Sequence, residues 1–538
     1  MNEPDQMYNL FEPFVDEGLS LLRKAVLVPE YPTVDNHYSL QEMIWQALSA
    51  QGMAASIASS SEILNDPKTL RRLSELMEIK PEVMTITLFG NQVIAVEAGN
   101  TANELFGVAF DIGTTTVVGM LVDINTKKVI AVCSKTNPQV SLGADVISRI
   151  QATHELLGGL EGLSQLIRQC LNRILEELCA AAGISPNYIY ATTVAGNATM
   201  VHLFLEISPS TLVRKPYTAL FKHMAPLCPA EVELAVNPAG KVVVLPNIAS
   251  FIGSDTTAAV LAVDQDVSTV PMLLVDLGTN CEMVLTDGDK LYACSTAAGP
   301  AFEGAHIRDG MRAAAGAITG VTITDDVQVE VIGDTKPTGI CGSGIVKAIA
   351  ELIKAGIVGP AGRINRSTAQ MLPPNLERRL KRKDNQWEFV LVEAKDSATG
   401  ADISVTQADI RQIQLVKSSI CTGIQFLLDR TPIQKELQVC LAGAFGNDFD
   451  VDSAIIIGML PGFKRDSIRP VGNAAGTGAI KALLFADKLQ RCNCIADKVD
   501  YVELAAQPNF QNKFLANLSF PVVKRDLASG GVFTPSEV

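Results

Sequence analysis

A strand–turn–strand unit with the pattern Asp-x-Gly-Thr occurs twice in this chain of 538 residues. In the first copy, the apolar run Val108–Asp111 leads into a Gly-Thr-Thr turn and a second predicted strand over 117–122. In the second copy, Leu273–Val275 leads into Asp276, and a similar pair of strands is predicted to follow. Because an internal duplication explains two such units better than chance does, we predict two similar lobes.

A Gly-Asn pair later in each copy supports the duplication. Gly196-Asn197 lies within Val194–Ala198, and Gly472-Asn473 lies within Val471–Ala475. Each pair precedes a stretch that can form a helix. Helical periodicity alternates with short β-branched runs between these motifs, so the predicted fold class is α/β.

A smaller module is predicted to precede the lobes. Asp66-Pro67 is typical of a helix start, and two β-rich runs joined at Gly90-Asn91 predict a hairpin. The predicted domains are a small N-terminal α+β module over 1–104, lobe I over 105–268, lobe II over 269–480 and a C-terminal extension on the core over 481–538.

The two Asp-x-Gly-Thr turns contain the groups that hold phosphate and magnesium. Glycine lets the backbone approach a phosphate and present N–H groups, and threonine hydroxyls donate to phosphate oxygens. An aspartate at a strand end can hold Mg²⁺ through water. One such pattern is often a simple turn, but two copies favour a phosphate clamp. The predicted residues are Asp111, Gly113, Thr114, Thr115, Asp276, Gly278, Thr279 and Asn280, with Asp111 and Asp276 as catalytic and Mg²⁺-binding groups.

Further segments are candidates for the same site. The glycine-rich run before a predicted helix at 345–355 suits an anion, and the small residues after the strand at 437–440 suit an adenine ring or ribose. Close packing of the chain is the alternative for both. Glu303 is expected either to orient water or Mg²⁺ or to be a structural carboxylate. Glu303 is assigned as a third catalytic residue. The residues assigned to ATP binding are Asn197, Asp255, Gly342, Ser343, Gly443, Phe445, Gly446 and Asn447.

Composition disfavours several functional classes. The net charge of −14 argues against general affinity for nucleic acid or anionic membrane. No apolar run approaches the ~18 residues of a membrane span. The 11 scattered cysteines are typical of reduced thiols in a cytoplasmic protein, and no Cys-x-x-Cys run predicts a zinc or iron–sulfur site. The basic segment 378–383 is expected to be a solvated face, with docking of an acidic partner as the alternative.

With these motifs in order, the chain resembles the acetate and sugar kinase/Hsp70/actin superfamily. Within it, the chain is similar to the reductive activators of corrinoid proteins over about 105 to 538, and more faintly before that. The segments that carry this second resemblance are Asn137–Gln139, Gly143–Arg149, Gly196–Met200, Ala298–Gly304, Gly339–Gly344 and Val471–Ala475.

The resemblance implies duplicated RNase H-like lobes of the actin/Hsp70/sugar-kinase type, with ATP and Mg²⁺ as cofactors. It implies an ATPase that drives the reduction of Co(II) corrinoid protein to Co(I). Members normally carry their own iron–sulfur domain, but this chain has no such cysteine run, so no intrinsic cluster is expected. Cys281 stands where the family pattern has glycine.

The expected partners are a corrinoid protein and a separate low-potential electron donor, in the cytoplasm and without nucleic acid or membrane. A homodimer is one assembly to test. Two alternatives stay open: a non-redox ATP-dependent chaperone or loading factor for a corrinoid methyltransferase system, and a small-molecule kinase, which the fold alone does not exclude.

Overall fold

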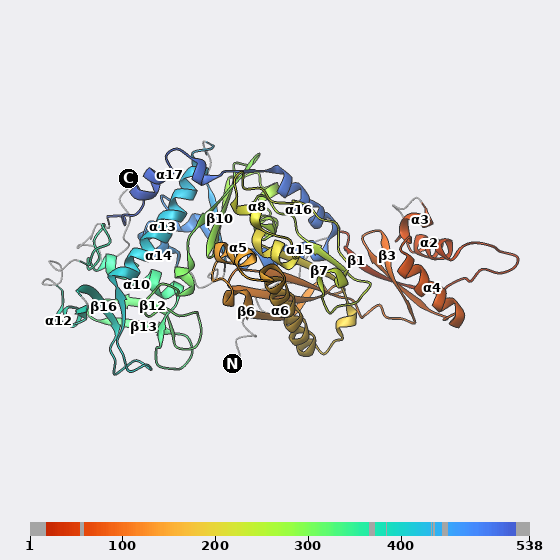
Figure 1. Ribbon diagram of the computed structural model, residues 1–538, viewed down its shortest axis with the longest axis horizontal. Helices are drawn as coiled ribbons and strands as arrows, with labels where there is room; N and C mark the ends of the chain where they lie inside the picture. The colour runs from red at the N-terminus through yellow and green to blue at the C-terminus, as the bar shows by residue number, and fades with distance from the viewer. Residues whose placement is uncertain are drawn as a thin grey trace. The chain divides into compact units, whose positions relative to one another are not determined.

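The chain divides into two compact units (Figure 1). The computed structural model describes residues 18–53, 59–364, 372–383, 385–431, 433, 436–443 and 450–522. The first unit runs to Asp264 and also takes in Ala474–Lys498, while the second consists of Gln265–Asn473 and the chain from Val499 onward.

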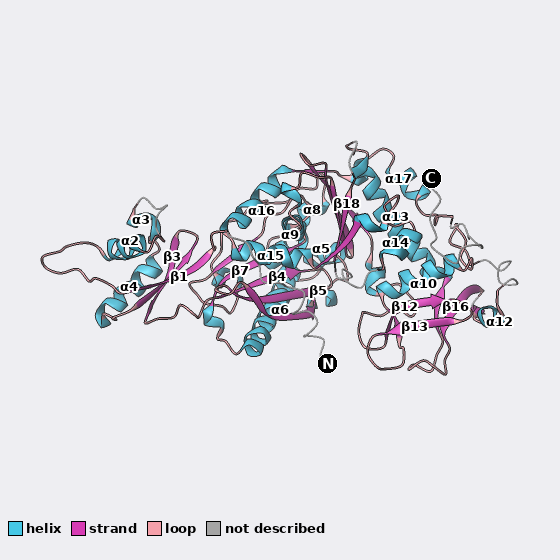
Figure 2. Cartoon of the chain, turned by 180° about the vertical axis from the view of Figure 1, so that it is seen from behind, coloured by secondary structure: helices cyan, strands magenta, loops and turns pink. Residues whose placement is uncertain are grey.

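A mixed sheet with strand order β6-β5-β4-β7-β8 lies at the centre of the first unit. Its first three strands form antiparallel hairpins, and β7 and β8 continue the sheet parallel to β4. The strands are β4 (Phe106–Ile112), β5 (Thr116–Asp123), β6 (Lys128–Thr136), β7 (Ile189–Gly196) and β8 (Lys241–Val244). The long helix α6 (Gly159–Ala182) packs on β5 and β6, with Leu163, Ile167 and Ile174 among its buried side chains (Figure 2).

The sheet of the second unit has the same construction, with strand order β19-β18-β9-β10-β11-β20. Again three consecutive strands, β9, β10 and β11, form antiparallel hairpins. Two more strands, β18 and β19, continue the sheet parallel to β9. The strands are β9 (Met272–Leu277), β10 (Asn280–Thr286), β11 (Leu291–Ala297), β18 (Gln438–Gly443), β19 (Ile468–Gly472) and the added edge β20 (Val499–Tyr501). The predicted α/β fold with duplicated lobes is confirmed.

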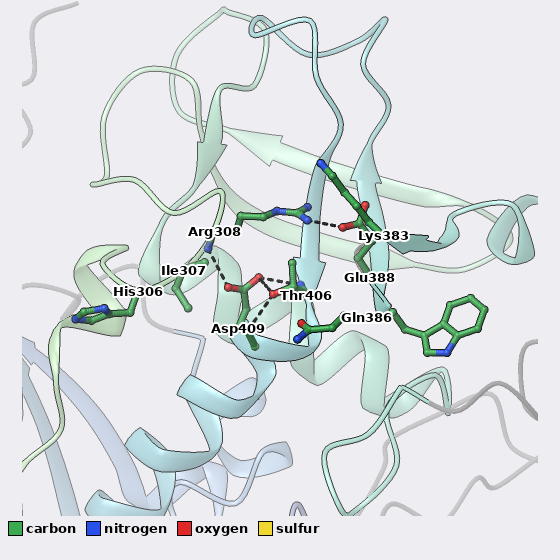
Figure 3. A pocket seen from close by; sticks show the side chains of 10 residues that line it. His306, Ile307, Arg308, Lys383, Gln386, Glu388, Thr406 and Asp409 are labelled. Atoms are coloured by element: carbon green, nitrogen blue, oxygen red, sulfur yellow. Dashed lines mark hydrogen bonds and ion pairs between the residues drawn. The ribbon is translucent and has the colours of Figure 1, made fainter.

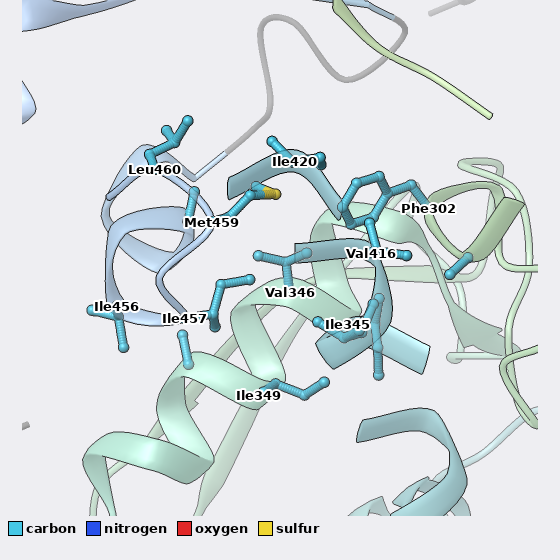
Figure 4. Close-up of a cluster of buried hydrophobic side chains, with 14 of the residues drawn as sticks. Phe302, Ile345, Val346, Ile349, Val416, Ile420, Ile456, Ile457, Met459 and Leu460 are labelled. Atoms are coloured by element: carbon cyan, nitrogen blue, oxygen red, sulfur yellow. The ribbon is translucent and has the colours of Figure 1, made fainter. Parts of the chain in front are cut away.

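Helices of the second unit meet in a large apolar core. α10 (Gly342–Lys354), α13 (Gln407–Leu428) and α14 (Val451–Ile456) bring their aliphatic side chains together beside Phe302 (Figure 4). Full burial of each such side chain contributes roughly 1.5–3 kcal/mol. Two small sheets extend this unit: β12 (Ala317–Ile323), β13 (Val327–Val331) and β14 (Gly339–Ile340) in one, and β15 (Leu380–Lys383), β16 (Gln386–Val392) and β17 (Ile403–Thr406) in the other.

The N-terminal module belongs to the first unit. β1 (Leu22–Leu27), β2 (Met84–Phe89) and β3 (Gln92–Ala98) form its sheet, and α2 (Leu40–Ala50), α3 (Ser60–Ile63) and α4 (Pro67–Ile79) complete its core. Asp66 caps α4 by accepting from the Thr69 N–H at 3.0 Å, and β2 and β3 pair across Gly90, so the predicted helix start and hairpin are confirmed.

Helix α15 (Ala474–Leu484) follows β19 of the second unit but packs within the first. It lies against α9 (Ser254–Ala262) so closely that a Cβ atom at Gly478 would be 1.8 Å from the Ala258 carbonyl oxygen. α16 (Ala486–Lys498) continues on the same unit. At the junction, the Leu21 N–H donates to the Leu484 carbonyl at 2.9 Å, which ties the N-terminal module to α15.

Candidate nucleotide site

The first Asp-x-Gly-Thr turn lies where parallel strands end together. Asp111 is opposite Ala195, and Ile112 is opposite Gly196, so the turn after β4 and the Gly-Asn pair after β7 share one edge of the sheet. The turn closes through Gly113, whose N–H donates to the Thr116 carbonyl at 3.0 Å. A Cβ atom on Gly113 would lie 2.6 Å from that oxygen, so this position requires glycine.

Asn197 links the Gly-Asn pair to the turn. It caps α7 (Ala198–Phe204): its Oδ1 atom accepts from the Met200 N–H at 3.0 Å. Its Nδ2 atom therefore faces the other way and donates to Thr114 Oγ1 at 2.9 Å. Because the Thr114 hydroxyl accepts this bond, its own proton can be directed to an anion.

Asp255 joins the same edge through the start of α9. A Cβ atom on Gly253 would lie 2.4 Å from the Cα atom of Asn197, and Ser254 Oγ bonds both the N–H and the carbonyl of Gly196 at 3.1 Å. Burial raises the pKa of Asp255 to about 6, against the lowering effect of the Thr256 N–H at 2.7 Å. The first unit thus brings the first turn, Asn197 and Asp255 together.

Residues behind the first turn complete its support. The sequence marked Asn137 and Arg149 only through family resemblance and gave them no role. Both lie fully buried and bond the carbonyl groups of the turn. The sequence signal for Arg149 is an arginine that follows a Gly-Ala-Asp stretch. The carbonyl group that it bonds is known only from the three-dimensional structure.

The second turn has a corresponding edge. Asp276 lies opposite Ala442 of β18, which lies opposite Gly472 of β19, so three strand ends stand side by side. Gly443 has a φ of +112°. A Cβ atom there would be 2.3 Å from the Leu277 carbonyl oxygen and 3.0 Å from Asp276 Oδ1, so glycine is required beside the aspartate.

Glu303 lies beside the second turn. Thr279 Oγ1 donates to Glu303 Oε1 at 2.8 Å, and the Gly299 N–H donates to the Thr279 carbonyl at 2.8 Å. The other carboxylate oxygen, Oε2, is buried and has no hydrogen-bond partner among the described residues. Burial raises the pKa of Glu303. A buried oxygen of this kind is suited to accept a proton from an ordered water.

The remaining predicted residues that the structure describes lie at the start of α10 or beside Thr279. α10 begins at Gly342, and Ser343 Oγ lies 3.3 Å from Cys341 Sγ. Gly344 accounts for the tight connection there, because a Cβ atom on it would be 2.0 Å from the Ile318 carbonyl. The 3₁₀ helix η5 (Pro300–Glu303) packs on α10. Gly278 and Asn280 flank Thr279, and Phe445, Gly446 and Asn447 lie outside the described residues.

Glu282 has no role predicted from the sequence, and it lies directly opposite Asp276 across the β9–β10 hairpin. Residues opposite each other in an antiparallel pair project from the same face, so the two carboxylates are neighbours. Ser295 Oγ donates to Glu282 Oε1 at 3.1 Å. The available sequence signal for Glu282 was a single carboxylate in the otherwise largely apolar strand β10.

A separate hollow of about 480 Å³ lies near the basic segment of the second unit (Figure 3). Arg308 in this hollow pairs with Glu388 by its side chain, and its N–H donates to Asp409 at 2.9 Å. Lys383 also lines the hollow. None of the residues predicted to bind the nucleotide lines it, so the hollow is not assigned to the nucleotide.

Comparison with known proteins places these motifs in a family. Two family models match: the RACo middle region over residues 106–268 and the C-terminal domain of RACo, the ASKHA domain, over 270–529. The chain is 38% identical over 460 residues to the corrinoid activation enzyme RamQ of Eubacterium limosum, covering 85% of this chain and 77% of that protein. The chain belongs to the RACo family of corrinoid activators.

A solved family structure agrees with this membership. The reductive activator for corrinoid, iron–sulfur protein superposes with a TM-score of 0.83 at 34% identity, covering 94% of this chain and 80% of that one. The [Co(II) methylated amine-specific corrinoid protein] reductase of Methanosarcina barkeri is 25% identical over 456 residues, 77% of each protein. Membership confirms the predicted ASKHA fold and the predicted class, an ATP-dependent activator of corrinoid protein.

Among the residues that the structure describes, no helix combines the length and the apolar character needed to cross a bilayer. Within the same residues, no group of three His, Cys, Asp or Glu side chains is arranged to hold a metal ion.

Proposed function

We propose that this chain couples ATP hydrolysis to the one-electron reduction of an inactive Co(II) corrinoid protein to its Co(I) state. The observation that carries the proposal is the pair of like Asp-x-Gly-Thr turns at corresponding strand ends of two duplicated sheets, in a member of the corrinoid activator family. ATP and water give ADP and phosphate, while the cobalt centre of the partner gains one electron from a donor.

In the proposed site, the residues of each turn are assigned to phosphate. Thr114 and Thr115 of the first turn donate to phosphate oxygens, and so do the Thr279 N–H and Asn280 of the second, while Gly113 and Gly278 allow close approach of the backbone. Asn197 fixes the Thr114 hydroxyl, and Asp255 supports the same edge. Gly342 and Ser343 are assigned to the anionic part of the nucleotide, and the adenosine end is assigned to Gly443, Phe445, Gly446 and Asn447.

Asp111 and Asp276 are the proposed holders of Mg²⁺ through water. Carboxylate oxygens at strand ends fit this hard cation, which keeps several of its waters when it binds protein. When bound, Mg²⁺ neutralises phosphate charge. Positioning and charge neutralisation account for most of the catalysis expected in phosphoryl transfer.

Glu303 is the proposed general base. The water that attacks the γ-phosphorus would give its proton to Glu303 Oε2, and the bond from the γ-phosphorus to the ADP oxygen would break. Thr279 holds the other oxygen at 2.8 Å, which fixes the direction of the carboxylate. A raised pKa brings the acid closer to the working pH, which favours proton transfer.

The proposed partners are a corrinoid protein and a separate low-potential electron donor, and the proposed location is the cytoplasm. The relatives named for a corrinoid protein support the first partner.

The test combines the purified chain, a Co(II) corrinoid protein and a low-potential reductant, and follows the visible spectrum. We expect the Co(I) spectrum to appear with Mg-ATP and not with a non-hydrolysable analogue. ATP consumption without Co(I) would instead favour a chaperone or loading factor. Phosphate transferred to an added hydroxyl compound, rather than released to water, would favour a kinase.

A further inference from the structure

Three consecutive carbonyl groups of the first turn are held from one side. The Gly113 carbonyl accepts from Asn137 Nδ2 at 2.9 Å, and the Thr115 carbonyl accepts from the Asn137 N–H at 2.9 Å. Between them, the Thr114 carbonyl accepts from Arg149 Nη2 at 2.6 Å. In a planar trans peptide the carbonyl and the next N–H point in opposite directions. The N–H groups that follow these carbonyls therefore face away from Asn137 and Arg149.

Arg149 is a buried cation without a paired anion. Its side chain is 0% exposed, and its acceptors among the described residues are neutral: the carbonyls of Gly143 and Thr114, Gln139 Oε1 and Met200 Sδ. Asp145 acts on it only through space, because that carboxylate caps α5 (Val146–Glu155) at the Ser148 N–H. Burial lowers the pKa of Arg149 to about 10, so the side chain stays charged at neutral pH.

Another buried arginine of the same unit is neutralised. Arg168 of α6 bonds the Phe204 carbonyl and pairs with Glu206 at 3.2 Å and Glu233 at 2.9 Å. Burying an ion costs several kcal/mol unless a counter-charge compensates it. The protein supplies that compensation for Arg168 but not for Arg149, which lies one hydrogen bond behind a turn assigned to phosphate.

The second turn differs in charge from the first. Its Thr279 carbonyl is held by the neutral Gly299 N–H, and its hydroxyl is held by the Glu303 carboxylate. The Thr114 carbonyl of the first turn is thus held by a cation, whereas the Thr279 carbonyl of the second is held by a neutral N–H group.

We propose that Arg149 is a positioning residue for the nucleotide: it locks the Thr114 carbonyl behind the first turn and supplies positive charge that the bound phosphates neutralise. This inference rests on the proposed function, because it takes ATP as the ligand. Arg149 acts through the Thr114 peptide and does not touch phosphate. Its loss should weaken nucleotide binding more than it slows the chemical step.

The experiment compares Arg149→Met with Arg168→Met in the full chain. Methionine replaces the aliphatic part of the side chain and removes the charged guanidinium group. Affinity for Mg-ADP, KM and kcat for ATP, and the free energy of unfolding are measured for each. We expect Arg149→Met to raise the Kd for Mg-ADP and the KM for ATP about tenfold, with a smaller change in kcat. Arg168→Met should lower stability and leave the Kd within about twofold.

The outcomes separate this inference from the proposed function. A wild-type chain that binds no nucleotide contradicts the proposed function itself. A wild-type chain that binds, with an unchanged Kd in Arg149→Met, overturns the role of Arg149 alone. So does an equal rise in Kd for both variants, because that is the result of general destabilisation.

A second variant covers a failure to fold. Arg149→Lys keeps the charge but replaces the planar fork of donors by a point charge. For this variant we expect a Kd raised about threefold with kcat retained. Wild-type affinity in a folded Arg149→Lys would overturn the proposed hold on the Thr114 carbonyl.

Discussion

At the scale of single residues, position in a hairpin register decides which carboxylates meet. The pattern Asp-x-Gly-Thr was sufficient to predict both turns, because each turn is formed by consecutive residues of the chain. Glu282 and Arg149 could not be assigned in this way. The first meets Asp276 only through strand pairing, and the second reaches the turn from a helix more than 30 residues later in the chain.

Asp111→Ala should abolish ATP turnover and leave the fold intact, because the proposed role of Asp111 is to hold Mg²⁺ and not to pack the core. Phosphate release and far-ultraviolet circular dichroism provide the measurement. The matched control is Asp123→Ala. Asp123 ends β5, at the end of the β4–β5 hairpin away from Asp111, and its carboxylate accepts only from turn N–H groups such as that of Asn125. Turnover by Asp111→Ala equal to that of the control would rule out the proposed role.

Gly443→Ala should be strongly destabilising. The added Cβ atom would clash with the Leu277 carbonyl at 2.3 Å, and the left-handed φ alone costs roughly 1–2 kcal/mol. Gly462→Ala is the control, because Gly462 also has a positive φ but no atom within 4 Å of the added Cβ. Urea unfolding should show a larger loss at 443 than at 462; equal losses would mean that the close approach to Asp276 does not exist.

Asp255 should make stability depend on pH. Its pKa is raised by burial to about 6, so the folded state binds this proton more tightly than the unfolded state does. The stabilisation is full below the unfolded pKa of about 4 and is lost as the pH rises through about 6. Asp255→Asn should flatten the unfolding free energy across this window. An unchanged slope between pH 4 and 6 would assign the dependence to other groups.

At the scale of elements, local signals predicted starts and turns well. Asp66-Pro67 opened α4 and Gly90-Asn91 turned the β2–β3 hairpin because caps and turns depend on neighbouring residues. The partner of α15 was not predictable in the same way. Its small apolar residues fit either sheet, and only tertiary packing places Gly478 against Ala258.

The N-terminal module should loosen when its buried ion pair is broken. Lys24 Nζ bonds Glu97 at 2.7 Å and Tyr190 of β7 at 3.3 Å, and its side chain is 1% exposed. Removing one partner of a buried pair costs ~3–5 kcal/mol. Lys24→Met should therefore speed hydrogen exchange in β1–β3. Arg72→Met, which breaks an exposed pair with Glu75, should leave exchange unchanged. Equal protection in the two variants would contradict the role of this pair.

At the scale of the whole molecule, the duplicated sheets were predictable from two turns and two Gly-Asn pairs. The unit to which each segment belongs was not predictable from the sequence. It depends on tertiary packing, since the chain returns to the first unit after β19. Nucleotide binding at the proposed residues has a direct consequence for stability. Mg-ADP at about 100 times its Kd should add about 2.7 kcal/mol of stability.

Nucleotide binding should also slow amide exchange at each turn. We expect slower exchange over 111–116 in the first unit and over 276–280 in the second as the nucleotide concentration rises. A turn that gains no protection would contradict the phosphate role proposed for its residues. Residues 60–79 of the N-terminal module are the internal reference, since no nucleotide contact is proposed there.

The placement of α15 also governs how this protein can be divided. The chain leaves the first unit after Asp264, returns at Ala474 and leaves again after Lys498. A fragment ending before Ala474 would therefore expose the face of α9 that α15 covers, and no single cut yields two intact halves. A chain in which a short linker joins Asp264 directly to Ala474 is the form in which the first unit can be isolated for study.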